Sequence, residues 1–263
     1  MSTQPIGIFD SGIGGTSILQ EIVKLLPQEN IIYLADSANA PYGERSKEEI
    51  VALCRKNVEW LMSKNCKLIV VACNTATTNA ITFLRKNYNI PFIGIEPAIK
   101  PAALNSKTHV IGVLATKGTL SSQLFAESAE QYTETTKVVE VVGKGLVEHI
   151  EQGDFNSAQL QKLLKGFVTP LISKNIDYLV LGCSHYPYLI DLLKVLLPND
   201  IKIIDSGEAV AKQTREVLKR NKILNLSNKE KRLVFFTNSH PKVLENISKM
   251  YFNNEKVHLN DDF

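Results

Sequence analysis

Short apolar runs alternate with amphipathic stretches along almost the whole chain, and this alternation constrains the fold more than any other feature. It is typical of repeated βα units built around a mainly parallel sheet. The predicted strands are 5–10, 31–36, 68–73, 92–96, 109–115, 137–142, 178–183, 201–205 and 232–237. Nine strands fit two smaller sheets better than one. We therefore expect an α/β protein with two similar Rossmann-like domains and mainly parallel sheets.

Two positions are suited to a change of domain. Prolines bracket the segment "EPAIKP" at 96–101, and "DSGEAVA" at 205–211 offers a second crossing at which the chain can return. We predict one domain from 1–97 plus 207–263 and a second from 98–206.

Between two early strands, residues 46–64 carry apolar side chains close to every 3.6 positions, which predicts a helix.

Composition narrows the function classes. The chain has 263 residues, 44% of them hydrophobic and 22% charged, which is ordinary for a globular protein that needs neither disulfide nor metal to hold its core. A net charge of +3 gives little support to a nucleic-acid partner. No signal peptide or membrane-spanning run is evident, so we expect a cytoplasmic protein without a membrane partner.

Cysteine ends a predicted strand twice, in "LIVVACNTATTNA" (68–80) and "YLVLGCSHYPYLI" (178–190). At the end of a strand and the start of a helix, unpaired amides and the helix dipole favour the thiolate of Cys73 or Cys183. Either residue could instead be a small buried hydrophobe. Their parallel placement, each before polar residues, favours a functional pair. Cys54 and Cys66 lack such neighbours, so we predict structural roles and, with no CxxC pair, four free thiols.

Polar loops follow two further strands, where ligands gather in parallel α/β sheets. "FDSGIGGTSIL" has Asp10 and Ser11 before three glycines whose amides could bind an anion, although such a loop can also be a simple tight connection. "ADSANAPYGERS" offers Asp36, Ser37, Tyr42 and Gly43, again as a site or a connector.

Two thiols from two domains allow two kinds of chemistry. One is a redox couple that forms a disulfide. The other is two-base chemistry, in which one thiolate removes a proton from one face of a carbon while the other thiol donates a proton to the opposite face. Asp10 and His185 are the nearest candidates to adjust the thiol pKa values.

These motifs together resemble the cofactor-independent glutamate racemases of bacteria. "GIFDSGIGGTSIL", "YLADSANAPYG", "VVACNTATTNA", "GIEPAIKPA", "GVLATKGTLSS", "LVLGCSHYPYL" and "IDSGEAVA" occur in the family's order over more than two hundred residues. The resemblance implies an active site in the cleft between two domains, no cofactor or metal, and interconversion of L- and D-glutamate for peptidoglycan. It also suggests a homodimer.

The resemblance further implies that Cys73 acts on the D-enantiomer and Cys183 on the L-enantiomer. The residues that it places at the substrate are Asp10, Ser11, Tyr42, Gly43, Asn74, Thr75, Ser184 and His185, and it links Asp36 and Glu151 with activity. Ser184 stands where the family usually has Thr. "GKGLVEHIEQG" (143–153) replaces the common "CPxFVPLVE", and the match of Glu151 runs through this stretch.

Three other functions compete with a glutamate racemase. A related two-cysteine racemase or isomerase, for example for aspartate, would differ mainly in the size of its pocket. A binding or regulatory protein on the same fold would not need both cysteines, which are present. A thiol redox protein would form a reversible disulfide between Cys73 and Cys183.

Overall fold

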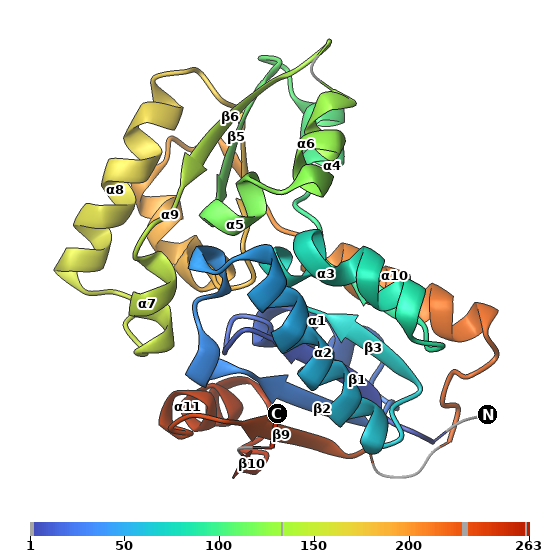
Figure 1. The fold of residues 1–263 in the computed structure, drawn as a ribbon. Helices are drawn as coiled ribbons and strands as arrows, with labels where there is room; N and C mark the ends of the chain where they lie inside the picture. The colour runs from blue at the N-terminus through green and yellow to red at the C-terminus, as the bar shows by residue number, and fades with distance from the viewer. Residues whose placement is uncertain (1–2, 133, 228–230, 261) are drawn as a thin grey trace.

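Two separate parallel sheets organise the computed structural model, which describes residues 3–132, 134–227, 231–260 and 262–263 (Figure 1). One has six strands in the order β10-β9-β2-β1-β3-β4, and the other has four in the order β6-β5-β7-β8. Their bounds are β1 Ile6–Asp10, β2 Ile31–Ala35, β3 Leu68–Val71, β4 Phe92–Gly94, β5 Val110–Ala115, β6 Lys137–Val142, β7 Tyr178–Gly182, β8 Lys202–Ile204, β9 Leu233–Thr237 and β10 Val257–Leu259. The predicted α/β class with two sheets is confirmed.

All nine predicted strands are present, and their ends differ from the predicted ends by at most two residues. The largest differences lie at the carboxyl ends of β3 and β4, where the chain leaves the sheet earlier, to enter the loop to α3 and the crossing to the other sheet. The short strand β10 was not predicted. It has only three residues and lies at the sheet edge beside β9, so it lacks the long apolar run of a buried strand.

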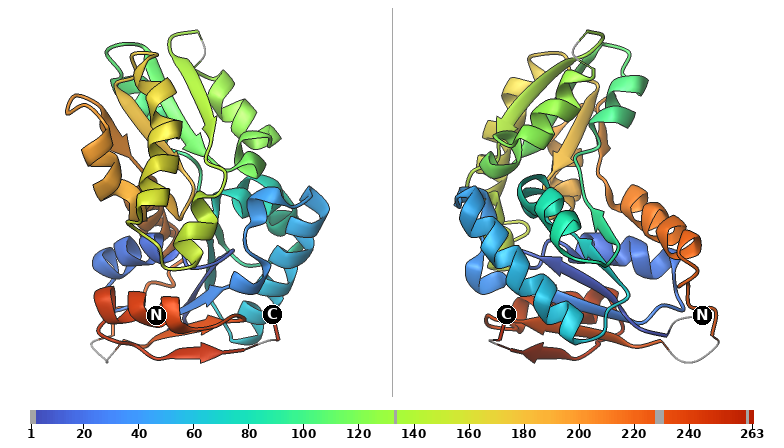
Figure 2. Two further views of the ribbon diagram at one scale, coloured as in Figure 1. Left: turned by 90° about the vertical axis from the view of Figure 1, so that its left-hand side faces the viewer. Right: turned by 45° about the vertical axis from the view of Figure 1, so that its right-hand side comes forward.

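Helices cover both sheets. In Figure 2 the four-stranded sheet lies in the upper part of the molecule and the six-stranded sheet in the lower part. The helices are α1 Thr16–Leu25, α2 Lys47–Ser63, α3 Asn74–Asn87, α4 Ile99–Asn105, α5 Lys117–Leu120, α6 Gln123–Glu130, α7 Leu146–Glu151, α8 Ala158–Ile172, α9 Ile190–Leu196, α10 Gly207–Arg220 and α11 Lys242–Tyr251. Short 3₁₀ turns occur at η1 Ser37–Asn39, η2 Tyr42–Glu44 and η3 Tyr186–Leu189. The predicted helix at 46–64 is α2, which begins after a capping box formed by Ser46 and Glu49.

The chain crosses between the sheets after β4 and again after β8. The two crossings lie side by side: the Ser206 hydroxyl in the second donates a hydrogen bond to the Glu96 carbonyl in the first. After the second crossing α10 packs against α1, beside the six-stranded sheet. The domain limits at 97/98 and 206/207 stay a prediction, and both fall in these crossings.

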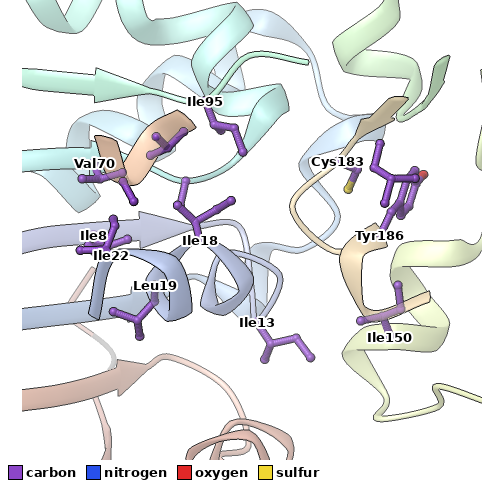
Figure 3. Close-up of a cluster of buried hydrophobic side chains, with 14 of the residues drawn as sticks. Ile8, Ile13, Ile18, Leu19, Ile22, Val70, Ile95, Ile150, Cys183 and Tyr186 are labelled. Carbon is purple, nitrogen blue, oxygen red and sulfur yellow. The ribbon is translucent and has the colours of Figure 1, made fainter. Parts of the chain in front are cut away.

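One apolar cluster continues from the first sheet to the loops of the second (Figure 3). Ile8 and Ile18 belong to the six-stranded side, whereas Ile150 and Tyr186 belong to the four-stranded side. Ile13, in the glycine loop between β1 and α1, is only 2% exposed within the same cluster. The loops after β1 and β7 therefore rest on one packed core.

A buried ion pair stabilises the amino ends of the central strands, away from these loops. Glu29 precedes β2, Lys67 precedes β3, and the Lys67 Nζ atom lies 2.6 Å from Glu29 Oε2. The other carboxylate oxygen accepts a hydrogen bond from the Asn225 amide at 2.8 Å. Separately, no helix in the described part of the chain combines the length and apolar character needed to cross a membrane.

Candidate active site

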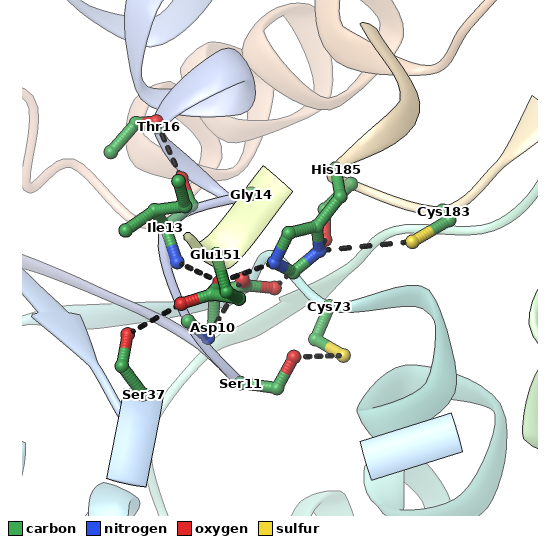
Figure 4. Close-up of polar contacts among 12 residues, drawn as sticks. Asp10, Ser11, Ile13, Gly14, Thr16, Ser37, Cys73, Glu151, Cys183 and His185 are labelled. Carbon is green, nitrogen blue, oxygen red and sulfur yellow. Dashed lines mark hydrogen bonds and ion pairs between the residues drawn. The ribbon is translucent and has the colours of Figure 1, made fainter. Parts of the chain in front are cut away.

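The two cysteines that follow β3 and β7 open into one small pocket, so the carboxyl ends of both sheets face it (Figure 4). Many of the predicted substrate residues line this pocket. Its lining consists of Ser11, Pro41, Tyr42, Gly43, Cys73, Asn74, Thr75, Thr116, Val147, Cys183 and His185. Asp10, Ser184 and Glu151 stand directly behind the lining, where they contact one another or His185.

Cys73 caps the amino end of α3, as its sequence context predicts. Its sulfur accepts a hydrogen bond from the Ala76 amide at 3.4 Å and donates one to the Ser11 hydroxyl at 3.5 Å. Burial nevertheless raises the pKa of the Cys73 thiol well above its usual range, and the Asp10 carboxylate raises it further. The amide at the helix start lowers this pKa, in the direction that was predicted, but burial outweighs its effect.

Cys183 has a different chemical partner. Its sulfur lies 3.7 Å from Nδ1 of His185, and Nε2 of the same ring lies 2.5 Å from Glu151 Oε1. Burial, the largest influence, lowers the pKa of His185, but hydrogen bonds and charge from Cys183 and Glu151 together raise it well above its ordinary value. The raised pKa favours the protonated ring, and the ring lies where it can exchange a proton with the sulfur.

Asp10 is the last residue of β1 and is fully buried. It lies close to Ser184, next to Cys183 in the chain, and its charge acts on Cys73. One carboxylate oxygen accepts a hydrogen bond from the Ser184 hydroxyl at 2.9 Å, and the other accepts one from the Gly12 amide at 3.0 Å. Burial raises the pKa of this carboxyl group, while the charge of His185 opposes the rise. Asp10 thus ties the loop after β1 to the loop after β7 and influences both sides of the pocket.

Glu151 belongs to the site, although the sequence around it departs from the family pattern. It is the last residue of α7, and its carboxylate reaches His185 from the four-stranded side. The Ile13 amide donates to Glu151 Oε1 at 2.7 Å, and the Ser37 hydroxyl donates to Oε2 at 3.0 Å. The anion that the glycine loop was predicted to bind is therefore, in this structure, the side chain of Glu151.

Asn74 and Thr75 face the pocket from the first turn of α3. Both polar atoms of the Asn74 side-chain amide are buried without a hydrogen-bond partner among the described residues, so they are available to a ligand. Thr75 is 2.8 Å from the hydroxyl of Thr116, which begins the turn into α5 on the other sheet. Sequence reasoning missed Thr116, although a polar residue directly after the strand 110–115 was the same signal that identified the other loops.

The loop after β2 contributes Pro41, Tyr42 and Gly43 to the lining of the pocket. The Tyr42 hydroxyl donates to Asp36, which also accepts hydrogen bonds from Asn39 at 2.7 Å and Asn238 at 2.5 Å. Asp36 does not line the pocket; it holds the loop that places Tyr42 and Gly43 there. An added Cβ on Gly43 would lie 2.8 Å from Thr116, so this loop closely approaches the other sheet.

The remaining cysteines lie away from the pocket. Cys54 and Cys66 are buried free thiols in the apolar cluster around α2, and burial raises the pKa of Cys66 to about 12. Such environments match the predicted structural roles. Among the described residues, no group of three or more His, Cys, Asp or Glu side chains is arranged to hold a metal ion.

Fold and site together define a two-sheet α/β protein that brings one thiol from each sheet to a single pocket. Comparison with known families makes this class specific: the sequence model of the Asp/Glu/hydantoin racemases matches residues 6–214. The chain belongs to this family.

Individual relatives agree with that assignment. A glutamate racemase of Stutzerimonas stutzeri is 48% identical over 221 residues, which are 84% of each chain. The structure of Escherichia coli glutamate racemase with L-glutamate and the activator UDP-MurNAc-Ala superimposes with a TM-score of 0.86 at 30% identity over 97% of each chain. The Francisella tularensis glutamate racemase in complex with D-glutamate gives 0.85 at 29% identity, over 99% of this chain and 97% of that one.

Proposed function

We propose that this protein interconverts L- and D-glutamate by proton transfer between Cys73, Cys183 and the α-carbon, without pyridoxal phosphate. The observation that carries the proposal is the convergence of one thiol from each sheet on one small pocket. Similarity to glutamate racemases whose structures contain either L- or D-glutamate supports the choice of substrate.

Inversion requires an acid and a base on opposite faces of the α-carbon. With L-glutamate, the thiolate of Cys183 takes the α-proton, and Cys73 donates its own proton to the other face. With D-glutamate the roles reverse. The raised pKa of Cys73 suits the proton donor of the first direction, while the imidazolium of His185 assists Cys183 as it exchanges its proton.

The α-proton is a very weak acid, so the negative charge that develops on the substrate must be stabilised. No lysine is among the described residues that line the pocket, so the lining offers no amine for a Schiff base. The unpartnered amide of Asn74 and the hydroxyls of Ser11, Thr75 and Thr116 are available to the two carboxylates. Fixed donors of this kind favour the transition state because they need no reorientation during the reaction.

The biological role that we propose is the one that the family resemblance implies. We propose that the D-glutamate formed is supplied to peptidoglycan synthesis and that the protein acts as a homodimer. Sedimentation of the purified protein tests the second point, and a D-glutamate requirement in cells that lack the protein tests the first.

The direct test of activity uses purified protein, free of added cofactor, with L-glutamate and separately with D-glutamate in deuterated water. Optical activity should fall toward zero from either side, and the α-hydrogen should exchange with solvent. Aspartate, assayed in parallel, tests the nearest alternative substrate. If neither L- nor D-glutamate is inverted, the proposal is refuted.

Single cysteine variants test the roles of the thiols. Cys73→Ala and Cys183→Ala should each abolish racemisation, whereas Cys66→Ala is the matched control because its thiol lies outside the pocket. Full activity in either of the first two variants would refute the two-base mechanism. A reversible disulfide between Cys73 and Cys183 that accounts for activity would support the redox alternative instead.

A further inference from the structure

Glu151 lies directly on the glycine loop between β1 and α1. The Ile13 amide donates to its Oε1 atom, which is also the atom that contacts His185 (Figure 4). An ideal Cβ added to Gly12 would lie 1.9 Å from this oxygen. The missing side chain at Gly12 is therefore what lets the carboxylate reach the loop.

Gly14 makes the corresponding room for the imidazole. A Cβ at this position would lie 2.3 Å from Nδ1 of His185. Neither Gly12 nor Gly14 has a positive φ angle, so left-handed backbone does not explain the choice of glycine. Close approach of the Glu151–His185 pair does explain it.

Ser37 holds the other side of the same carboxylate. Its hydroxyl donates to Glu151 Oε2 at 3.0 Å, and it lies in η1, directly after the loop that follows β2. Ile13 and Ser37 both belong to the six-stranded side, whereas Glu151, His185 and Cys183 belong to the four-stranded side. The carboxylate that contacts His185 is thus oriented by groups from the opposite sheet.

We propose that Gly12, the Ile13 amide and Ser37 form a docking seat for Glu151, which aligns His185 with Cys183 only when the loops of the two sheets are packed together. The inference rests on the proposed racemase function and deepens it. It makes Gly12 and Ser37 positioning residues for the Cys183 side of the reaction, while the Cys73 side has its own partners, Ser11 and Ala76.

Two variants weaken the seat to different extents. Ser37→Ala removes one hydrogen bond to Glu151, and we expect kcat/KM to fall about tenfold. Gly12→Ala inserts a methyl group where the carboxylate lies, and we expect a loss on the order of a hundredfold, as when a general acid or base is misplaced. Gly166→Ala is the matched control, because an added Cβ there meets nothing within 4 Å, and it should keep full activity.

Isotope effects distinguish misalignment of one side from general damage. With α-deuterated substrates, a slower Cys183 step should raise the deuterium isotope effect on kcat/KM for the enantiomer that Cys183 deprotonates. For the other enantiomer it should fall toward unity, because proton donation by Cys183 then limits the rate. Equal changes for both enantiomers would overturn the proposal, and Ser37→Ala provides this measurement even if Gly12→Ala fails to fold.

A double-variant cycle tests whether the seat acts through Glu151. In a Glu151→Ala background the added methyl group at Gly12 no longer meets a carboxylate, so Gly12→Ala should cause no further loss. Losses that multiply would overturn the inference. If the unaltered protein racemises glutamate and Gly12→Ala is as active as Gly166→Ala, this inference alone is overturned. If the unaltered protein is inactive, the proposed function is overturned as well.

Discussion

Replacing Glu151 with glutamine tests the electrostatic arrangement on the Cys183 side without changing its shape. The contact between Glu151 Oε1 and His185 Nε2 is 2.5 Å, and the carboxylate helps to raise the pKa of His185 against the opposing effect of burial. A hydrogen bond to a charged group contributes about 1.5–3 kcal/mol. Loss of the charge should therefore lower kcat/KM by about ten- to a hundredfold.

The pH profile should change in a defined direction. The imidazolium is the form proposed to assist Cys183, so activity is lost as pH rises through the pKa of His185. Without the Glu151 charge, burial lowers that pKa, and the alkaline limb of kcat/KM should move to lower pH. Asp10 and Cys183, the other titratable groups beside the ring, are unchanged in the variant.

The assay measures kcat/KM from both enantiomers across the neutral and alkaline range. The two values must agree in every variant, because L- and D-glutamate have equal free energies in solution. Glu148→Gln, on the same helix but exposed, is the control and should leave the profile unchanged. An unshifted alkaline limb in Glu151→Gln would refute the assignment of His185 as the imidazolium partner of Cys183.

Three further variants test substrate binding and the supporting structure. Asn74→Ala should raise KM about tenfold, because a hydrogen bond to the substrate is lost. The melting temperature should stay level or rise, because the variant removes a buried amide that has no partner. An unchanged KM would exclude a substrate contact. Asp36→Asn should destabilise the protein by about 1–3 kcal/mol and raise KM, because an amide cannot accept every hydrogen bond that now holds the Tyr42 loop; denaturant unfolding and KM measure both effects. Lys67→Ala should lower the free energy of unfolding by about 3–5 kcal/mol, because the buried charge of Glu29 loses its partner. KM should be unchanged in the folded fraction. A loss below about 1 kcal/mol would contradict that account.

Much of the fold could be predicted because strand formation and burial are local signals. Apolar runs identified nine strands, and the rule that ligands gather at carboxyl ends of parallel strands placed Cys73, Cys183 and Asn74 near one site. The short edge strand β10 lacked that local signal. The capping box of α2 was encoded within four residues, from Ser46 to Glu49, and the predicted helix matched closely.

Properties that depend on distance in space could not be derived from local patterns. Only the resemblance suggested Glu151, because its contacts with Ile13 and Ser37 join residues more than a hundred positions apart. The pKa of Cys73 required the extent of burial, which a strand-to-helix junction does not specify. The glycine loop was recognised as an anion-binding element, but its occupant comes from the other sheet.

The difference between the two thiols originates in the residues that follow each of them. After Cys73 the chain enters an α-helix at once, since the Thr77 amide donates to the Cys73 carbonyl at 2.9 Å. The equivalent donor after Cys183 would be residue 187, a proline without an amide hydrogen. The Tyr186 amide takes that place at 3.1 Å, so the chain turns more tightly, and the turn leaves the His185 ring beside the sulfur. Two similar strand ends thus acquire unlike proton partners, so the two proton transfers that make up one racemisation are chemically unequal.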